Sequence, residues 1–277
     1  MRQGSADLHV HTSFSDGLHR PADVVEMAKS AGLTWIGITD HDAVGGIGEA
    51  LEAAERLGVG CVPGVELSVD YRGQDFHILG YWIDPENGAL RELLGEILES
   101  RSRRADRIIS RLHAMGVRIT LEEIRKQMTG PRYIGRPHIA QALMARGDVQ
   151  TFPEAFVRYI GRDAPAYVPK EPLEPSEALA VIRGAGGVPV MAHPGAYRMD
   201  GAFRVFLSEG LAGLETDHPK HSVEQQASFR RLAQQHDLVM TGGSDFHGRG
   251  VSDAVVGGVT VDARVLDELA ARKDSKR

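Results

Sequence analysis

Short apolar strands alternate with amphipathic helices over the first 83 residues, and this alternation restricts the chain to a few folds. Strands are predicted at "ADLHVHT", "TWIGITD", "VGCVPGVELSV" and "DFHILGYWI", and helices at "RPADVVEMAKSAG" and "GEALEAAERLG". A proline near its start and Gly32 past its end mark the limits of the first helix. Strand–helix–strand units of about 30 residues favour a mostly parallel α/β sheet or barrel.

The alternation stops at about residue 88, and only helical patterns follow up to about residue 160. They are "ALRELLGEILESRSRRADRIISRLHAMG", "TLEEIRKQM", "RPHIAQALMARG" and "TFPEAFVRYIG". A proline-rich link, "DAPAYVPKEPLEPSEAL", then leads to further strands at "GGVPVMAHPG", "GLAGLETD", "DLVMTGGSDFHG" and "VVGGVTVD". We therefore expect a barrel built from residues 1–87 and 168–277, with residues 88–167 inserted as a helical subdomain that covers the active site.

The composition is that of a globular protein, with 42% hydrophobic and 25% charged residues in a chain of 277. No run of about 18 apolar residues predicts a membrane span. The first ten residues, "MRQGSADLHV", lack the apolar stretch of a signal peptide. The single cysteine, Cys61, excludes an internal disulfide and is typical of a reducing compartment. These features predict a cytoplasmic protein without a membrane partner.

The distribution of charge is uneven. The net charge of −6 argues against a general nucleic-acid coat, but residues 91–136 carry eleven Lys and Arg against six Asp and Glu. This segment is therefore about +5, and the rest of the chain about −11. A basic segment on an acidic body fits an anion-binding flap beside metal-binding carboxylates. The alternative is a solvated helical face.

Nine side chains of the types that bind metal ions occur at or near the ends of six predicted strands. His9 and His11 are two residues apart on one strand, so they face the same way. Because the carboxyl ends of barrel strands meet at one face, we expect the whole set to converge there and to form a metal centre. The set is His9, His11, Asp16, His41, Glu66, His77, His193, Asp245 and His247.

Six motifs that carry these side chains resemble, in the same order, the polymerase and histidinol phosphatase (PHP) superfamily. They are "DLHVHTSFSDG", "GITDHD", "GVELS", "HILGY", "AHPG" and "GSDFH", and the match covers about residues 6–83 and 186–250. The resemblance implies a distorted (β/α)7 barrel with two or three divalent ions at its carboxyl-terminal mouth. It also implies that all nine side chains are ligands.

The resemblance further implies how the ligands are shared. One family arrangement places His9, His11, Glu66 and Asp245 on a first ion, with Glu66 bridging to a second. His77 and His193 would complete the second ion, and Asp16, His41 and His247 would serve a third position. Glu66 and Asp245 are then expected to be catalytic. Six imidazoles favour manganese, zinc or iron over magnesium, and we expect Mn²⁺ first.

Divalent ions at such a centre would provide the chemistry of a phosphoesterase. A water on the metal loses a proton near neutral pH and becomes a hydroxide nucleophile, and the ions neutralise charge on a phosphoryl oxygen. No protein nucleophile is then required. Cys61 lies in the apolar segment "VGCVPG", where a core position is expected.

Two further segments suggest contacts to a substrate. The segment "IGRPHIAQAL" resembles the PHP branch that acts on nucleotide 3′,5′-bisphosphates and trims RNA from its 5′ end, which implies that Arg136 and His138 clamp a phosphate. The alternative is that His138 only caps its helix. The segment "ETDHPKHS" aligns loosely with a loop of the same branch, which makes His221 a candidate catalytic residue, Lys220 a substrate contact and His218 an additional neighbour.

We therefore expect a metal-dependent phosphoesterase that hydrolyses nucleotide 3′,5′-bisphosphates or the 5′ ends of short RNA. The substrate would be a phosphorylated small molecule or a short nucleic acid, and no obligate protein partner is indicated. Histidinol-phosphate phosphatase, or another small-molecule phosphomonoesterase, is the alternative enzyme. A metal-binding module without activity is the alternative outside enzymes.

Overall fold

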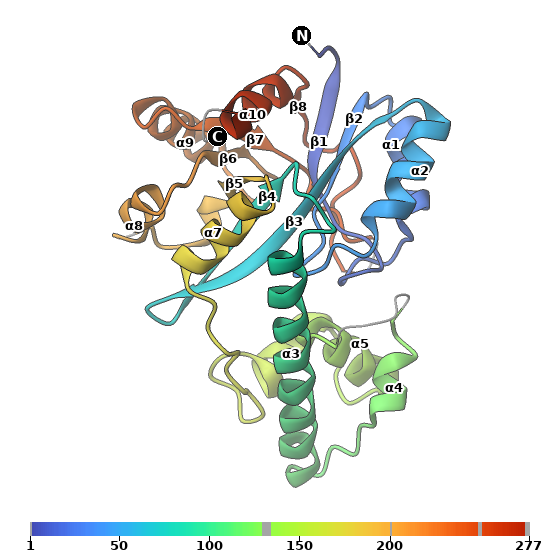
Figure 1. Cartoon of the computed structure of the whole chain (residues 1–277). Helices are drawn as coiled ribbons and strands as arrows, with labels where there is room; N and C mark the ends of the chain where they lie inside the picture. The colour runs from blue at the N-terminus through green and yellow to red at the C-terminus, as the bar shows by residue number, and fades with distance from the viewer. Residues whose placement is uncertain (1, 129–133, 200, 249–250, 275–277) are drawn as a thin grey trace.

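One mixed sheet forms the centre of the fold. A computed structural model describes residues 2–128, 134–199, 201–248 and 251–274 (Figure 1). The strands lie in the order β7-β6-β5-β4-β3-β2-β1-β8. They are β1 (Ser5–Val10), β2 (Trp35–Ile38), β3 (Gly60–Tyr71), β4 (Gln74–Tyr81), β5 (Val188–Met191), β6 (Gly213–Asp217), β7 (Val239–Gly242) and β8 (Val261–Asp262).

The sheet consists of two parallel halves joined by one reversed strand. Strands β1, β2 and β3 are parallel, and so are β5, β6 and β7. The strand β4 is antiparallel to both of its neighbours, because a tight hairpin at Tyr71 and Gln74 connects it directly to β3. The prediction of a mostly parallel sheet thus holds within each half, and β4 is the antiparallel strand between them. The short β8 also runs antiparallel to β1.

The sheet curls until its two ends nearly meet. The segment after β7 lies beside β1, where Val10 forms a bridge with Phe246 and the Asp245 N–H donates to the His9 carbonyl at 2.9 Å. Asp7, on the same strand, accepts hydrogen bonds from Ser244 N at 2.9 Å and Gly257 N at 2.8 Å. These bonds hold β1 against the segment that follows β7. The expected distorted barrel is thereby confirmed.

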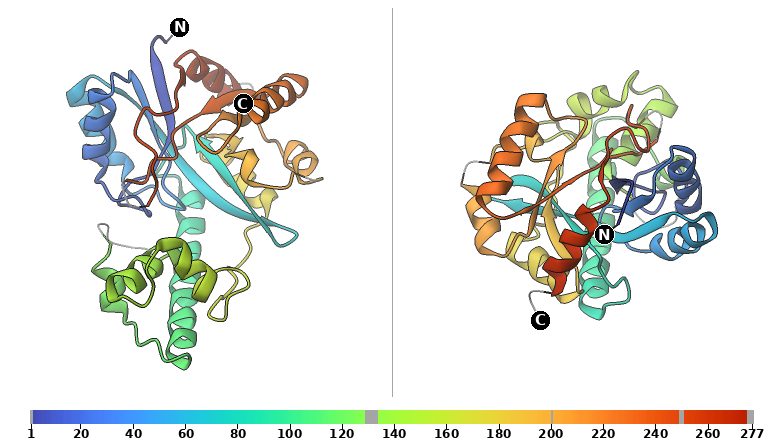
Figure 2. Two further views of the ribbon diagram at one scale, coloured as in Figure 1. Left: turned by 180° about the vertical axis from the view of Figure 1, so that it is seen from behind. Right: turned by 90° about the horizontal axis from the view of Figure 1, so that it is seen from above.

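Helices surround the sheet (Figure 2). The helix α7 begins inside the segment that we predicted as a proline-rich link, because Pro175 occupies the first helical turn, where its missing N–H costs nothing. No helix in the described part of the chain is long and apolar enough to cross a bilayer. The surrounding helices are α1 (Pro21–Ser30), α2 (Ile47–Leu57), α7 (Pro175–Gly184), α8 (Ala202–Ser208), α9 (Val223–Gln235) and α10 (Val265–Asp274).

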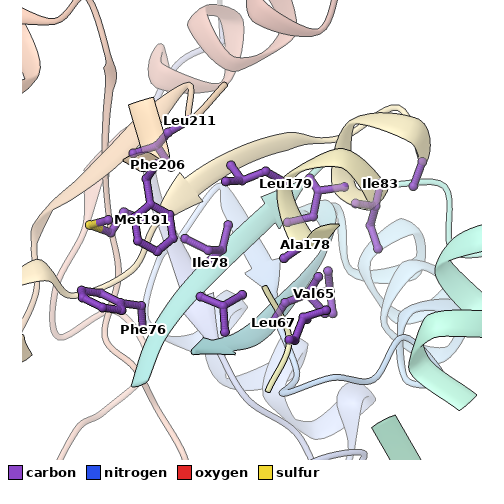
Figure 3. Packing of buried hydrophobic residues seen from close by; sticks show 14 of the residues in the cluster. Val65, Leu67, Phe76, Ile78, Ile83, Ala178, Leu179, Met191, Phe206 and Leu211 are labelled. Carbon is purple, nitrogen blue, oxygen red and sulfur yellow. The ribbon is translucent and has the colours of Figure 1, made fainter. Parts of the chain in front are cut away.

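The side chains of β3 and β4 alternate between two cores. Leu67 and Ile78 point outward and pack with Leu179 of α7 and Phe206 of α8 (Figure 3). Leu79, the next residue on β4, packs instead with the residues that fill the barrel. The same alternation determines which polar side chains of these strands enter the interior.

The inserted helices have a core of their own. They are α3 (Gly88–Ala114), α4 (Leu121–Arg125), α5 (Arg136–Arg146) and α6 (Phe152–Ala155), which continues into a π-helical turn (Phe156–Ile160). Leu112 of α3 packs there with Leu143 of α5, whereas Leu90, at the start of α3, packs on the barrel. Figure 1 shows α3 running from the barrel into the inserted helices, which lie beyond one end of the sheet.

Barrel closure requires a glycine directly after β7. A Cβ atom on Gly243 would lie 2.4 Å from the His9 nitrogen and 2.5 Å from the His9 Cβ. By contrast, a Cβ on Gly95, exposed in α3, would meet no atom within 4 Å. Gly243 is therefore required by the close approach of His9, whereas Gly95 has room for a side chain.

We expect Gly243→Ala to lower the free energy of unfolding by about 1–3 kcal/mol, since the methyl group must push apart two packed backbones. Gly95→Ala should raise it by up to about 1 kcal/mol, because alanine stabilises a helix interior relative to glycine. Urea denaturation of the two variants measures both changes. A Gly243→Ala protein as stable as the wild type would contradict the close approach of β1 and the segment after β7.

Candidate metal centre

Strand alternation places the first group of polar side chains inside the barrel. On β3, Glu66 lies between outward-facing residues and points to the interior, where it is fully buried. On β4, His77 has the same orientation as Leu79 and faces the same interior. His9 on β1 and His11 just past its end are also fully buried.

Four side chains converge on one point. His9 Nε2 and His11 Nε2 are 3.1 Å apart, and each lies 3.2 Å from Glu66 Oε2. Asp245 Oδ1 lies 3.3 Å from His11 Nε2 and 3.6 Å from His9 Nε2. Ligands about 2.1 Å from a shared ion, at right-angled or tetrahedral geometry, are separated by about 3.0–3.5 Å. The spacing therefore matches a common ion.

The two carboxylate oxygens of Glu66 face different groups. Whereas Oε2 faces His9 and His11, Oε1 lies 2.8 Å from His77 Nδ1 and 3.0 Å from His193 Nε2. His41 Nδ1 also approaches Oε2, at 3.1 Å. A carboxylate in this position can bridge two ions.

The remaining predicted ligands form a third group beside the first two. His247 Nε2 lies 3.2 Å from Asp16 Oδ1. The ligand atoms of His11, Asp16, His41 and His247 all lie within 4.8 Å of one another. The structure thus brings all nine predicted side chains together. The clusters overlap, since His11 and His41 each belong to more than one of them, and the assignment of ligands to three ions stays a prediction.

Backbone strain accompanies two of these side chains. His193 and Asp245 have φ angles of 27° and 52°, in the left-handed region that residues other than glycine rarely adopt. Such conformations cost about 1–3 kcal/mol each and persist where the surroundings enforce them, often at functional sites.

A buried carboxylate that we did not predict orients two of the histidines. Glu215 on β6 is fully buried, and its Oε1 lies 2.9 Å from His9 Nδ1 while its Oε2 accepts a hydrogen bond from the His193 N–H at 2.6 Å. An Nδ1–H that donates to Glu215 leaves the His9 Nε2 lone pair directed at the centre. The signal was present in the sequence, as an acidic residue within the apolar strand "GLETD".

A second unpredicted carboxylate supports the loop after β1. Asp40 accepts hydrogen bonds from Thr12 N at 2.7 Å, Thr12 Oγ1 at 2.7 Å and Ser15 Oγ at 2.6 Å. These bonds hold the loop that carries Asp16 against the end of β2. Asp40 directly precedes the predicted ligand His41.

The electrostatic field of the centre favours cations. Burial alone would raise the pKa of Glu66, but His41, His9 and His77 hold that pKa well below its usual range. Burial would also raise the pKa of Asp245, but His9 and His11 hold that pKa well below its usual range. Both carboxylates are therefore ionised, and a divalent cation can replace the protons that this field attracts to the imidazoles.

The residues present fit divalent metal ions on three grounds. The donors are imidazole nitrogens and carboxylate oxygens, which suit first-row transition metals. Their spacing is that of shared ligands. In addition, His11 Nδ1, Asp16 Oδ1 and His41 Nδ1 are buried without a partner in hydrogen-bond geometry, which is costly unless a cation or another group satisfies them.

The predicted clamp residues lie at the junction of insertion and barrel. His138 of α5 is 5% exposed, and its Nδ1 accepts a hydrogen bond from the Gly135 N–H at 3.0 Å, so it does cap its helix. Burial lowers the pKa of His138, while the nearby Asp16 carboxylate raises it, which places the ring on the Asp16 side of the centre. The capping role is therefore observed, and the phosphate contact of His138 stays a prediction.

Three arginines of the insertion line one small cavity of about 10 Å³, namely Arg101, Arg104 and Arg136. The Arg136 guanidinium lies 5.7 Å from the ring centre of Tyr167, and that of Arg104 lies 5.9 Å from the same ring. Burial lowers the pKa of Arg104 to about 10, and the charge of Arg136 adds to this shift. The like charges repel one another, so an anion would relieve the cluster.

His221 does not reach the centre. Its Nε2 accepts a hydrogen bond from the Gly195 N–H at 3.1 Å, and its Nδ1 lies 3.0 Å from the Thr216 carbonyl. Both ring nitrogens are thus engaged by the backbone, and neither is free for the catalytic role that we predicted. Lys220 Nζ, in contrast, lies 3.2 Å from Asp245 Oδ2, and His218 Nε2 lies 3.3 Å from the same oxygen.

Known proteins are similar to this chain over most of its length. A 3′,5′-nucleoside bisphosphate phosphatase from Chromobacterium violaceum is 34% identical over 256 residues, which cover 91% of this chain and 90% of that protein. A 5′-3′ exoribonuclease from Haemophilus influenzae is 32% identical, covering 87% of this chain and 89% of that protein.

Solved structures are similar over nearly the whole chain. A structure described as a metal-dependent phosphoesterase from Bifidobacterium adolescentis has a TM-score of 0.90 at 35% identity, covering 98% of this chain and 97% of that one. An amidohydrolase from Chromobacterium violaceum, with bound sulfate and no metal, has a TM-score of 0.88 at 33% identity and covers 96% of each chain. The family model for the PHP domain matches residues 7–151, and the chain therefore belongs to the PHP domain family.

Proposed function

We propose that this protein is a metal-dependent phosphoesterase that hydrolyses phosphate esters of nucleotides, either 3′,5′-bisphosphates or the 5′ ends of short RNA. The observation that carries the proposal is the position of Glu66, whose two oxygens face two separate groups of imidazoles 2.8–3.2 Å away. A carboxylate shared in this way is typical of centres that hold two ions for phosphoryl transfer.

The residues of the centre have distinct tasks in this proposal. His9, His11, Glu66 and Asp245 would hold the first ion, and Glu66, His77 and His193 would hold the second. Asp16, His41 and His247 would serve the third position. When bound, divalent ions acidify a water and neutralise charge on the phosphoryl oxygens. Mn²⁺ is the proposed metal, with Zn²⁺ and Fe²⁺ as the alternatives.

The insertion supplies the contacts that select the substrate. Arg136 presents a planar guanidinium that can bind a phosphate through two parallel hydrogen bonds. Arg104 lines the same cavity, so the positive charge there exceeds that of one side chain. A substrate with more than one phosphate suits this arrangement, in agreement with the bisphosphate named for the Chromobacterium relative.

Phosphate release from a substrate panel in added manganese tests the function. The panel contains 3′,5′-bisphosphates, mononucleotides, histidinol phosphate and short 5′-phosphorylated RNA. A preference for bisphosphates or RNA supports the proposal, whereas a preference for histidinol phosphate supports the alternative phosphatase. No turnover of any ester would leave only a metal-binding module. A cytoplasmic location and independence from protein partners remain predictions.

Metal reconstitution should load at least two divalent ions per chain and raise the melting temperature. The nine ligands exceed the coordination of one ion, and ions that bind only the folded state stabilise it. Metal analysis and calorimetry of chelated and reconstituted protein measure both effects. One ion or fewer per chain in excess manganese would contradict a multinuclear centre.

Glu66→Gln should abolish turnover and lower the ion content, because an amide cannot supply the same charge to two cations. The matched control is His236→Ala, at an exposed histidine directly after α9 and outside the centre. Phosphate release and metal analysis are compared for both variants. Equal losses in the two would mean that the centre lies elsewhere.

Arg136→Ala should lower kcat/KM for a nucleotide bisphosphate roughly tenfold to a hundredfold, the effect of losing a charge-assisted contact worth about 1.5–3 kcal/mol. The ions should stay bound, since Arg136 is not a ligand. Arg136→Lys should recover only part of the loss, because an ammonium lacks the planar fork. A kcat/KM within twofold of the wild type for every substrate would remove Arg136 from the phosphate clamp.

A further inference from the structure

His218 is a buried histidine at the centre that lies outside the nine predicted ligands. It follows β6 and is 1% exposed. Its Nε2 atom lies 3.3 Å from Asp245 Oδ2, yet it has no partner in hydrogen-bond geometry. A buried polar atom without a partner costs free energy, and its position against a catalytic carboxylate indicates a group that it could bind.

The hydrogen bond at the opposite ring nitrogen determines where the proton lies. The backbone N–H of Lys220 donates to His218 Nδ1 at 3.1 Å, so Nδ1 holds a lone pair. In the neutral ring the proton must then be on Nε2. His218 therefore directs an N–H donor, and not a lone pair, at the centre.

This arrangement is the reverse of that of two predicted ligands. His9 Nδ1 faces the carboxylate of Glu215 at 2.9 Å, and His247 Nδ1 faces the Asp245 carbonyl at 2.9 Å. These acceptors place the proton on Nδ1 in both rings, which frees each Nε2 lone pair for a metal ion. Because His218 has the opposite tautomer, it is unsuited to be a tenth ligand.

The donor at His218 does not stand alone. Lys220 Nζ lies 3.2 Å from the same oxygen, Asp245 Oδ2, while Asp245 Oδ1 faces His9 and His11. Asp245 Oδ1 thus faces the proposed position of the first ion, whereas Oδ2 faces two donors, His218 Nε2 and Lys220 Nζ. The Lys220 side chain is 67% exposed, so it can move aside without breaking buried contacts.

We propose that His218 Nε2–H donates a hydrogen bond to a phosphoryl oxygen of the substrate, beside Asp245 and with Lys220 as a second donor. The ligand is a phosphate group on the first-ion side of the centre, away from the Asp16 side, where His138 lies. This inference rests on the proposed phosphoesterase function and adds a substrate contact to it. His218 has no role in binding metal.

Binding of inorganic phosphate to the manganese-loaded protein tests the contact. We expect His218→Ala to raise the Kd for phosphate roughly tenfold to a hundredfold, as for a lost hydrogen bond to a charged group, with unchanged manganese content. His218→Gln, which keeps an N–H donor, should recover part of the affinity. His236→Ala, at an exposed histidine, is the matched control and should leave the Kd unchanged. Titration calorimetry and metal analysis provide the two readouts.

Two results would overturn the proposal. If His218→Ala loses metal while its remaining loaded fraction binds phosphate normally, His218 is a ligand. If its metal content and its Kd both match those of the wild type, the donor does not reach phosphate. A wild-type protein that binds phosphate through His218 yet hydrolyses no ester would leave the contact standing and would remove the proposed function.

A second measurement uses the wild-type protein and does not depend on the folding of a variant. Nitrogen-15 spectra of the imidazoles in zinc-loaded protein, a diamagnetic sample, report the tautomer of each ring. We expect a proton on His218 Nε2, with a shift of that resonance when phosphate is added; His218→Gln assigns the signal. A proton on Nδ1, or no response to bound phosphate, would contradict the proposal.

Discussion

The burial of the Glu66 carboxylate is the constraint on which the rest of the centre depends. An ionised carboxylate inside a barrel is unstable unless cations or hydrogen-bond donors compensate its charge. Glu66 is fully buried, and five imidazoles surround it within 3.2 Å. Those imidazoles come from strands and loops that are far apart in sequence. The barrel must therefore close with the correct register for all of them to compensate the charge together.

The reversal of β4 is what brings His77 into this set. In a uniformly parallel barrel, the ligands come from the carboxyl ends of the strands. Here β3 continues past the mouth to Tyr71 and returns as β4, so that the beginning of β4 lies at the mouth. His77, near the start of β4, consequently faces Glu66 at 2.8 Å. Because β4 runs in the opposite direction to β3, its amino-terminal half lies at the edge where the parallel strands end.

The sequence was sufficient to predict which side chains converge at the centre, because their types are rare and their phase along the strands is regular. His9 and His11 share one face of β1, and Glu66 is a charged residue within an apolar strand. The barrel with its inserted helices followed from the alternation of elements. The direction of β4 did not, since an apolar strand pattern does not report which way its neighbour runs.

The supporting residues were harder to predict, because their roles exist only in three dimensions. Glu215 matters through bonds to His9 and to the His193 backbone, which lie about 206 and 22 residues away along the chain. His221 matched a family segment and proved to be tied to the backbone, whereas His218, three residues earlier, faces Asp245. Spacing in a loop does not define which of two histidines turns inward.

The insertion is joined to the candidate metal centre through a buried ion pair. Arg101 of α3 pairs with Asp42, which directly follows the ligand candidate His41. Asp42 also accepts a hydrogen bond from Ser68 N at 3.1 Å and has a φ angle of 47°. A buried pair of this kind adds little net stability, because desolvation offsets the attraction, but breaking it leaves a charge uncompensated.

The value of this pair therefore lies in orientation. It links α3 to the turn that carries His41, and α3 also carries Arg104, which lines the same small cavity as Arg136. A displacement of the inserted helices would therefore move the arginines of that cavity and expose the Asp42 carboxylate at once. The Arg101–Asp42 pair thus fixes the position of α3, which carries side chains that would select a substrate, relative to the turn that carries His41, which would hold an ion.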